Sequence, residues 1–179
     1  YVYEEQSMIL VDQHGHKNTR KLRRYSRAYE SGTVNFLLLF DSPLDVKGVA
    51  LLAQREQDGE SRQSFYLPAF GETFIENSPG PEGKSEDNFL GTDYSISNLV
   101  GDTLDHHTHV RRNDTTINDT DYFVVDVYDL GSHAEDNPER RHYIQKDNLY
   151  ISRTDHFDKI GRLQKRQTNH DLTKVHGDM

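Results

Sequence analysis

The chain has 179 residues with 30 acidic and 21 basic side chains, so its formal charge is −9, and only 33% of its residues are apolar. This length predicts a single domain over residues 1–179, and the abrupt end at Met179 leads us to expect a truncated C-terminus. Without cysteine there is no disulfide scaffold or thiolate zinc site, the acidic balance argues against nucleic-acid binding, and the apolar runs are too short for membrane-spanning helices.

Period-two alternation of apolar and polar residues recurs along the chain, whereas helical periodicity is scarce. The alternation predicts strands at residues 8–12, 20–29, 34–41, 49–55, 63–70, 121–128, 142–145, 149–154 and 162–168. Turn residues separate these stretches at hairpin lengths, which leaves no room for the helical crossovers of parallel sheets. The sequence therefore predicts a mainly β (α+β) fold in which an antiparallel meander forms one curved sheet or barrel.

Two of the predicted strands have a strongly apolar face. One face of residues 34–41 carries Val34, Phe36, Leu38 and Phe40, and one face of residues 121–128 carries Phe123, Val125 and Val127. Such faces require cover, because burial of apolar surface contributes about 25 cal/mol per Å². A β-core closed on itself could supply that cover, as could loops, a short helix or a ligand.

The segments between the predicted strands are mostly polar. Residues 76–88 are rich in Pro and Gly and predict a loop. Ile96, Leu99 and Val100 form an apolar stripe that predicts a short helix over residues 96–104. Residues 105–120 are rich in His, Asn, Asp and Thr, which is typical of a solvated loop.

Motifs that carry chemistry are weak in this sequence. Residues 78–85 end like a phosphate-binding loop but begin with Ser78 and contain two prolines, so we interpret them as an ordinary loop. His106, His107 and His109 follow Asp102 and Asp105 and could meet at a metal, but the further ligands cannot be identified. We therefore expect no metal site, no cofactor and no catalytic residue.

A basic segment interrupts the acidic chain between residues 20 and 27. Its cations are Arg20, Lys21, Arg23, Arg24 and Arg27, and strand alternation sends charge to both faces. A solvated edge strand is the simplest interpretation, because cations at sheet edges discourage aggregation. The alternative is a patch that binds anionic headgroups or an acidic partner.

Two segments resemble a known family. Residues 36–52, FLLLFDSPLDVKGVALL, match a strand and turn of the pattern F-x-x-P-x-D-x-K-G-T-x-L-L, with Val49 in place of Thr. Residues 65–70, FYLPAF, match the pattern W-x-Y-L-P-A without its Trp. Residues 88–99, NFLGTDYSISNL, match the pattern F-x-G-S-D-F-x-x-E-D-L with Thr92 for Ser, Tyr94 for Phe and Ser97-Asn98 for the acidic pair. Residues 150–158, followed by Gly161, resemble a later hairpin of the same proteins. The chain thus resembles the outer membrane lipoprotein-sorting, or LolA-like, family.

This resemblance implies an unclosed antiparallel β-barrel, a half-barrel whose concave apolar face is covered by short helices or loops. It implies a periplasmic carrier that binds a lipid or lipoprotein acyl chain and passes it to an envelope partner, such as an inner-membrane transporter or an outer-membrane acceptor, and that serves an export pump. The chain begins with Tyr1 and shows no secretory leader, so we expect the leader to have been removed. The alternatives are an envelope sensor or adaptor of the same fold, docked through the basic segment, and an enzyme that acts on a lipid.

The resemblance also assigns residues to the expected site. The cavity wall would consist of Phe36, Leu38, Phe40, Leu51, Phe65, Leu67, Phe123, Val125 and Val127. The lid would come from residues 71–88 and 96–104, with Phe74, Phe89, Ile96, Leu99 and Val100 as candidates.

Overall fold

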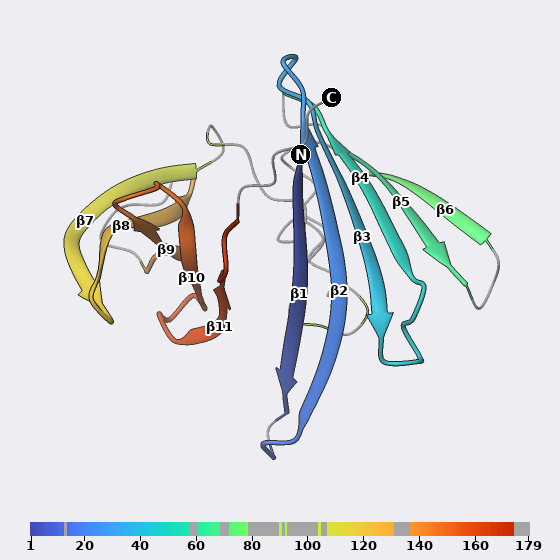
Figure 1. The fold of residues 1–179 in the computed structure, drawn as a ribbon, viewed down its shortest axis with the longest axis horizontal. Helices are drawn as coiled ribbons and strands as arrows, with labels where there is room; N and C mark the ends of the chain where they lie inside the picture. Colours follow the sequence, from blue (N-terminus) through green and yellow to red (C-terminus); the bar gives the residue numbers. More distant parts are fainter. Residues whose placement is uncertain are drawn as a thin grey trace. The chain divides into compact units, whose positions relative to one another are not determined.

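All regular elements of the described chain are β-strands. The computed structural model describes residues 1–12, 14–57, 61–68, 72–78, 90, 92, 104, 107–130 and 137–173 (Figure 1). The strands are β1 (Val2–Val11), β2 (Lys17–Ala28), β3 (Val34–Ser42), β4 (Ala50–Arg55), β5 (Ser61–Leu67), β6 (Glu72–Ser78), β7 (His107–Ile117), β8 (Thr120–Asp129), β9 (Arg140–Gln145), β10 (Ile151–Phe157) and β11 (Leu163–Thr168). Over these described ranges no helix is long and apolar enough to cross a membrane.

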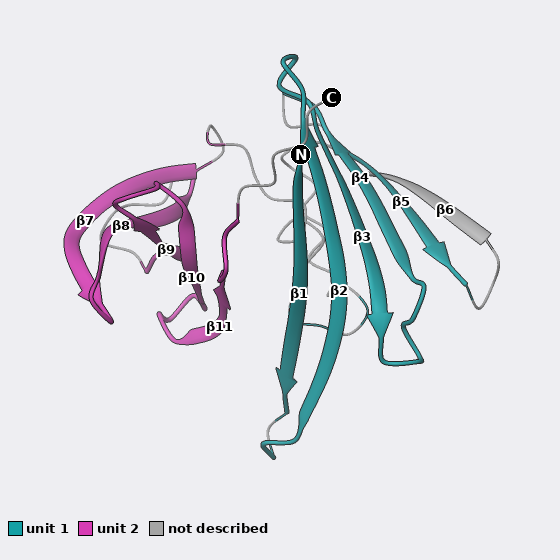
Figure 2. Cartoon of the chain, in the orientation of Figure 1, with its two compact units in different colours: residues 1–103 teal, residues 104–179 magenta. Residues whose placement is uncertain are grey.

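The strands form two antiparallel meanders. Strands β1 to β6 pair in chain order in a six-stranded sheet, and β7 to β11 do so in a five-stranded sheet. The sheets belong to two compact units, unit 1 (residues 1–103) and unit 2 (residues 104–179), shown in Figure 2. Among the described strands neither sheet closes on itself, which confirms the predicted unclosed antiparallel β-architecture. The single continuous sheet expected from the sequence is instead two sheets.

Short turns with local hydrogen bonds set the hairpins. Between β1 and β2, the Asp12 carboxylate accepts hydrogen bonds from the backbone N–H groups of His14, at 2.8 Å, and His16, at 2.9 Å. Between β7 and β8 the loop has two residues, Asn118 and Asp119, with φ of 47° and 62°. Asn and Asp tolerate this left-handed conformation, which a type I′ hairpin turn requires at both positions.

Two strands were missed by the alternation of the sequence. β6 extends to Ser78 and so includes the start of the segment predicted as a loop. β7 is an eleven-residue strand in the segment interpreted as a solvated loop. Strand β7 is polar because it lies at a sheet edge, where polar side chains are tolerated and protect against aggregation. Residues 79–88, and the predicted helix except Leu104, lie outside the described residues.

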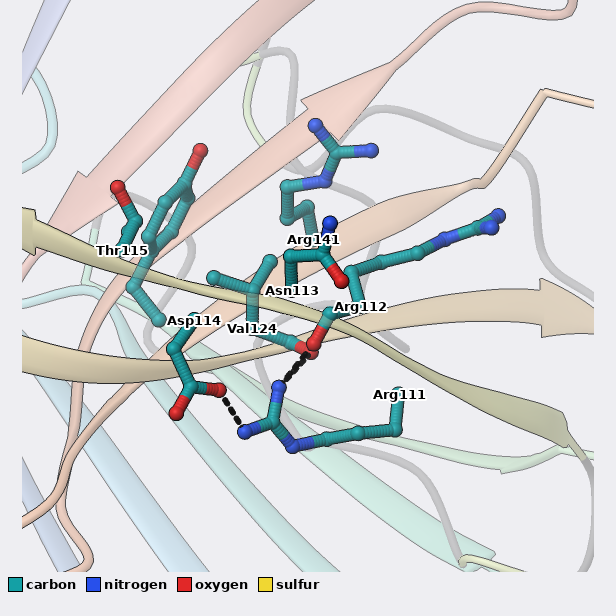
Figure 3. A pocket seen from close by; sticks show the side chains of 8 residues that line it. Arg111, Arg112, Asn113, Asp114, Thr115, Val124 and Arg141 are labelled. Atoms are coloured by element: carbon teal, nitrogen blue, oxygen red, sulfur yellow. Dashed lines mark hydrogen bonds and ion pairs between the residues drawn. The ribbon is translucent and has the colours of Figure 1, made fainter.

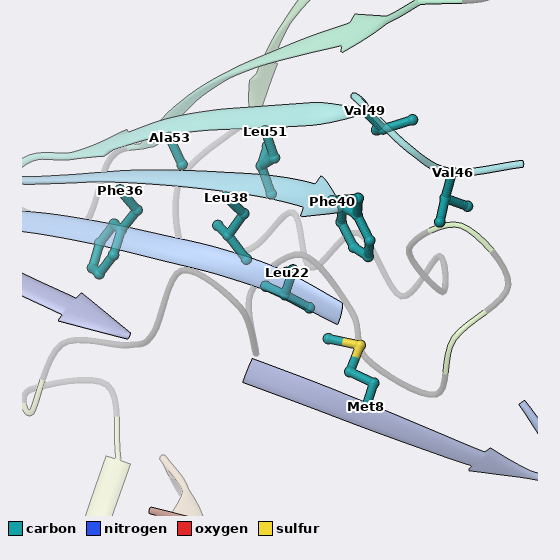
Figure 4. Close-up of a cluster of buried hydrophobic side chains, with 9 residues drawn as sticks. All are labelled: Met8, Leu22, Phe36, Leu38, Phe40, Val46, Val49, Leu51 and Ala53. Atoms are coloured by element: carbon teal, nitrogen blue, oxygen red, sulfur yellow. The ribbon is translucent and has the colours of Figure 1, made fainter. Parts of the chain in front are cut away.

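The core of unit 1 lies on one face of its sheet. Strand partners place its side chains together, since Leu38 pairs with Leu51 and Phe36 pairs with Ala53. Nine buried apolar residues from β1 to β4 and the β3–β4 turn form the cluster in Figure 4: Met8, Leu22, Phe36, Leu38, Phe40, Val46, Val49, Leu51 and Ala53.

A row of alternating charges crosses the sheet of unit 2. Asp126 in β8, Arg141 in β9, Asp155 in β10 and Arg166 in β11 are successive strand partners. Nε of Arg141 donates to Asp126 at 2.5 Å, and Nε of Arg166 donates to Asp155 at 2.6 Å. Arg112 in β7 adds a further bond to Asp126, at 2.7 Å. These charge-assisted bonds connect the strands on the face of β8 that also carries the buried side chains of Val124 and Tyr128.

Candidate functional site

The structure brings six of the predicted cavity residues onto one face of unit 1. Phe36, Leu38, Phe40 and Leu51 are buried in the core cluster, and Phe65 and Leu67 in β5 pack against it while partly buried. The β4–β5 register pairs Leu51 with Phe65, so the face continues from β3 across β4 to β5. This face is referred to below as the apolar face of unit 1, and its partly buried residues Phe65 and Leu67 are those at which a hydrocarbon would bury further apolar area.

Two arginines share the apolar face of unit 1. Met8 pairs with Arg20 and Arg24 pairs with Leu38, so alternate residues of β2 point to the same side as the core. Arg20 is 8% exposed and donates to the backbone oxygen of Leu90 at 2.7 Å. Arg24 donates to Glu4 at 3.2 Å and lies 4.8 Å from the centre of the Phe36 ring. The alternation Arg20-Leu22-Arg24 is the sequence signal that could have revealed this mixed face.

The predicted basic patch does not form one surface. Arg20 and Arg24 lie on the apolar face, whereas Lys21, Arg23 and Arg27 alternate to the opposite one. The strand that carries them, β2, is an interior strand paired on both sides, so the edge-strand interpretation is wrong. The strand is interior because residues 2–11, more than the sequence predicted, form β1 beside it.

Two of the three cations on the opposite face of β2, Arg23 and Arg27, have local partners. Arg23 forms two hydrogen bonds with Asp41, at 2.9 and 2.8 Å, and this contact lowers the pKa of the Asp41 carboxyl below its ordinary value. Arg27 lies over the rings of Tyr1 and Tyr29, at 4.7 and 4.6 Å. Much of the charge in this segment is therefore engaged within unit 1.

The remaining predicted wall residues, Phe123, Val125 and Val127, lie in β8 of unit 2. They share one face of that strand, and Val127 is 1% exposed. Phe123 lies below two cations, with Arg111 at 4.8 Å and Lys146 at 5.4 Å from its ring centre. That these residues belong to one cavity with the apolar face of unit 1 stays a prediction.

Histidines surround Val125 and Val127 on the same face of unit 2. Val127 pairs with His109 in β7 and Val125 pairs with His142 in β9, while His156 in β10 lies one strand further. Burial, followed by the charge of Arg140, lowers the pKa of His142 to about 4. Burial, followed by Lys165, lowers the pKa of His156 to about 3. Both imidazoles are therefore neutral at pH 7, so they add polar groups rather than charge to this face.

The predicted lid residues are placed only in part. Phe74 lies in strand β6 and is the strand partner of Phe65 in β5. It therefore belongs to the sheet rather than to a separate covering segment. Phe89, Ile96, Leu99 and Val100 lie outside the described residues. Leu90 is described, and it packs against the core cluster of unit 1.

A polar hollow in unit 2 was not predicted. It is open to solvent, has a volume of about 690 Å³ and lies beside the irregular stretch of β7 between Arg112 and Thr115. Figure 3 shows side chains that line it. Its lining residues are Arg111, Arg112, Asn113, Asp114, Thr115, Val124, Arg141 and Tyr143. Among these residues Arg111 and Asp114 form an ion pair, and Arg112 and Arg141 each form an ion pair with Asp126. This lining is suited to water and polar groups rather than to hydrocarbon.

Solved structures with the same fold come from bacterial proteins. An outer membrane lipoprotein-sorting protein domain from Vibrio parahaemolyticus is 22% identical, with a TM-score of 0.73 over 97% of this chain and 71% of that one. A DUF1329 family protein from Desulfovibrio piger is 23% identical, with a TM-score of 0.66 over 92% of this chain and 68% of that one. The LolA superfamily protein NE2245 from Nitrosomonas europaea is 12% identical, with a TM-score of 0.55 over 99% of this chain and 71% of that one.

Comparison of the sequence itself gives the family. No curated protein matches this chain. A family model whose description reads "Uncharacterized protein" matches residues 32–179, which is most of the chain. The chain therefore belongs to this family, and it shares the fold of the lipoprotein-sorting domain and of the LolA superfamily protein.

Proposed function

We propose that this protein is a periplasmic carrier that holds an acyl chain of a lipid or lipoprotein on the apolar face of unit 1. The observation that carries the proposal is the continuity of that face, from Met8 in β1 to Phe65 in β5. Most of this face is buried within unit 1, but Phe65 and Leu67 remain partly exposed, and the LolA-like fold supports their cover by a bound hydrocarbon. The name of the Vibrio parahaemolyticus relative supports a role in the sorting of lipoproteins.

Binding on such a face is non-covalent and therefore reversible. Each buried CH₂ contributes about 0.8 kcal/mol, so chain length sets the affinity more than any single contact. A carrier of this kind needs no nucleophile or general base, and release follows when a partner offers the chain an equal or larger apolar surface. The proposed partners are membrane proteins of the envelope, namely an inner-membrane transporter or an outer-membrane acceptor.

Charge placed at Phe65 should abolish acyl-chain binding. Phe65 packs against the core cluster but is only partly buried, so Phe65→Glu is expected to leave unit 1 folded while it adds a carboxylate to the apolar face. The matched control is Tyr66→Glu, because Tyr66 is adjacent, 42% exposed and on the opposite face. Fluorescent fatty acid should bind to wild type and to Tyr66→Glu, and at least about tenfold more weakly to Phe65→Glu. Equal binding by the two variants would contradict the proposed site.

A further inference from the structure

Three side chains of unit 2 gather donor atoms that a metal ion could share. They are His107 at the start of β7, Asp129 at the end of β8, and Glu139 directly before β9, and one ligand atom from each lies within 4.8 Å of the others. Three separate segments supply them. The group is distinct from the apolar face of unit 1, and its chemistry is not needed for acyl-chain binding.

The backbone fixes these three residues in place. His107 and Asp129 are strand partners in the β7–β8 ladder. The N–H of Glu139 donates to the carbonyl of Val127 at 2.9 Å, and its own carbonyl accepts from the N–H of Phe157 at 2.9 Å. The chain therefore needs only side-chain rotations to complete a site, which keeps the cost of binding low.

The distance between two of the donors fits a shared ion. Nε2 of His107 lies 3.6 Å from Oε2 of Glu139, which exceeds an ordinary hydrogen bond. Two ligands of a tetrahedral ion with bonds of about 2.0–2.1 Å lie roughly 3.3 Å apart. The His107 side chain is 8% exposed and Glu139 Oε2 is itself buried, so a bound ion would be partly withdrawn from water.

We propose that His107, Asp129 and Glu139 bind one divalent transition-metal ion of the zinc class. An imidazole with two carboxylates suits Zn²⁺, Mn²⁺ or Fe²⁺, whereas Ca²⁺ and Mg²⁺ prefer oxygen ligands alone. The two carboxylates balance the charge of the ion. Three protein ligands leave at least one position open to water or to a further ligand.

Nearby cations limit the affinity of this site. Arg140 in β9 and Lys165 in β11 both pair with His156 in β10, which places them on the face that carries Val127. Their charges oppose a second cation, so affinity in the micromolar range is expected rather than the tighter binding of a structural zinc finger. The bound ion would connect the ends of β7 and β8 to the start of β9 and so stabilise unit 2.

Zn²⁺ titration of the metal-stripped full chain tests the proposal. Protein without an affinity tag is treated with chelator and dialysed, and Zn²⁺ binding is measured by calorimetry together with the shift in Tm. Wild type should bind one Zn²⁺ per chain, and its Tm should rise. His107→Gln and Glu139→Gln should bind Zn²⁺ more than about tenfold more weakly, because loss of even a group that only supports a ligand lowers metal affinity by about 10–100-fold. His16→Gln is the control, because His16 and Asp12 form a second histidine–carboxylate pair, at 2.9 Å, in the β1–β2 turn.

Two outcomes separate this site from incidental binding. Unchanged binding by His16→Gln together with weakened binding by both unit 2 variants supports the proposal, provided that each variant keeps the circular dichroism spectrum of wild type. If Glu139→Gln folds and binds Zn²⁺ as tightly as wild type, or if His16→Gln removes the binding, the proposal is wrong. Mg²⁺ in place of Zn²⁺ should leave Tm unchanged, and an equal gain with Mg²⁺ would overturn the assignment of ion class.

Discussion

Replacement of Leu51 by alanine should lower the free energy of unfolding by about 2–5 kcal/mol. Leu51 is 0% exposed and lies in the middle of the apolar face of unit 1, between its strand partners Leu38 and Phe65. Truncation removes buried methyl groups and leaves a cavity that the surrounding sheet fills only in part. Urea unfolding monitored by circular dichroism measures the loss.

The neighbouring residue provides the control for Leu51. Leu52 has the same side chain but points to the opposite face of β4 and is 50% exposed. Leu52→Ala should therefore change the free energy of unfolding by less than about 1 kcal/mol. Similar losses in the two variants would show that the two faces of this sheet do not differ in burial.

Removal of the Asp126 carboxylate should destabilise unit 2 by about 2–4 kcal/mol. The Asp126 side chain is 0% exposed and accepts hydrogen bonds from Arg141 and Arg112. Asp126→Ala leaves two guanidinium groups without their shared anion, at the β8 end of the charged row. The arginine side chains are 34% and 39% exposed, so water recovers part of the loss, and the estimate lies below that for a fully buried pair.

Acid should reveal the same interaction in wild type. Burial alone would raise the pKa of Asp126, but the hydrogen bonds from Arg141 and Arg112 outweigh it and hold that pKa below its ordinary value. A carboxylate whose pKa is lower in the folded than in the unfolded state stabilises the folded state at pH values above the unfolded-state pKa. This stabilisation is lost as the pH falls through the folded-state pKa. Thermal unfolding between pH 7 and pH 3 should therefore show a smaller acid-induced loss in Asp126→Ala than in wild type.

Asp114 is the matched control for Asp126. It also binds two cations, Arg111 and Lys146, but its side chain is 43% exposed. Exposed ion pairs contribute little, so Asp114→Ala should cost less than about 1 kcal/mol. An Asp126 variant as stable as the Asp114 variant would contradict the role given to the charged row.

The sequence predicted those parts of the fold in which alternation and burial agree. In residues 34–41 one face is wholly apolar, with Phe36, Leu38 and Phe40, whereas the other face is mixed and includes Asn35 and Asp41, and burial alternates accordingly along β3. The prediction of that strand and of its inward face follows directly from the period of two. The same reasoning placed Phe65 and Leu67 on the face that they occupy.

The parts that could not be predicted depend on partners distant in the chain. β7 contains few apolar residues and becomes a strand because β8 pairs with it across the turn at Asn118 and Asp119. Propensity for strands depends strongly on such neighbours, so a polar edge strand leaves little trace in its own sequence. The division of the meander into two sheets likewise depends on which strands pair. The residue pattern within a single strand carries no information about that pairing.

The candidate metal site shows the same limit. His107 is next to two other histidines in the sequence, but Asp129 and Glu139 reach it only through the β7–β8 pairing and the backbone contacts of residue 139. The sequence placed these histidines in a loop, where no further ligands could be named. Strand register is the information that brings the three side chains together.

Lipid extraction tests most directly whether the protein carries an acyl chain. Protein purified from cells in which it is exported to the periplasm is extracted with organic solvent, and the extract is analysed by mass spectrometry. The account predicts acyl lipid in near-stoichiometric amount from wild type and from Tyr66→Glu, with little from Phe65→Glu. Wild-type protein that yields no more lipid than Phe65→Glu would contradict the carrier function.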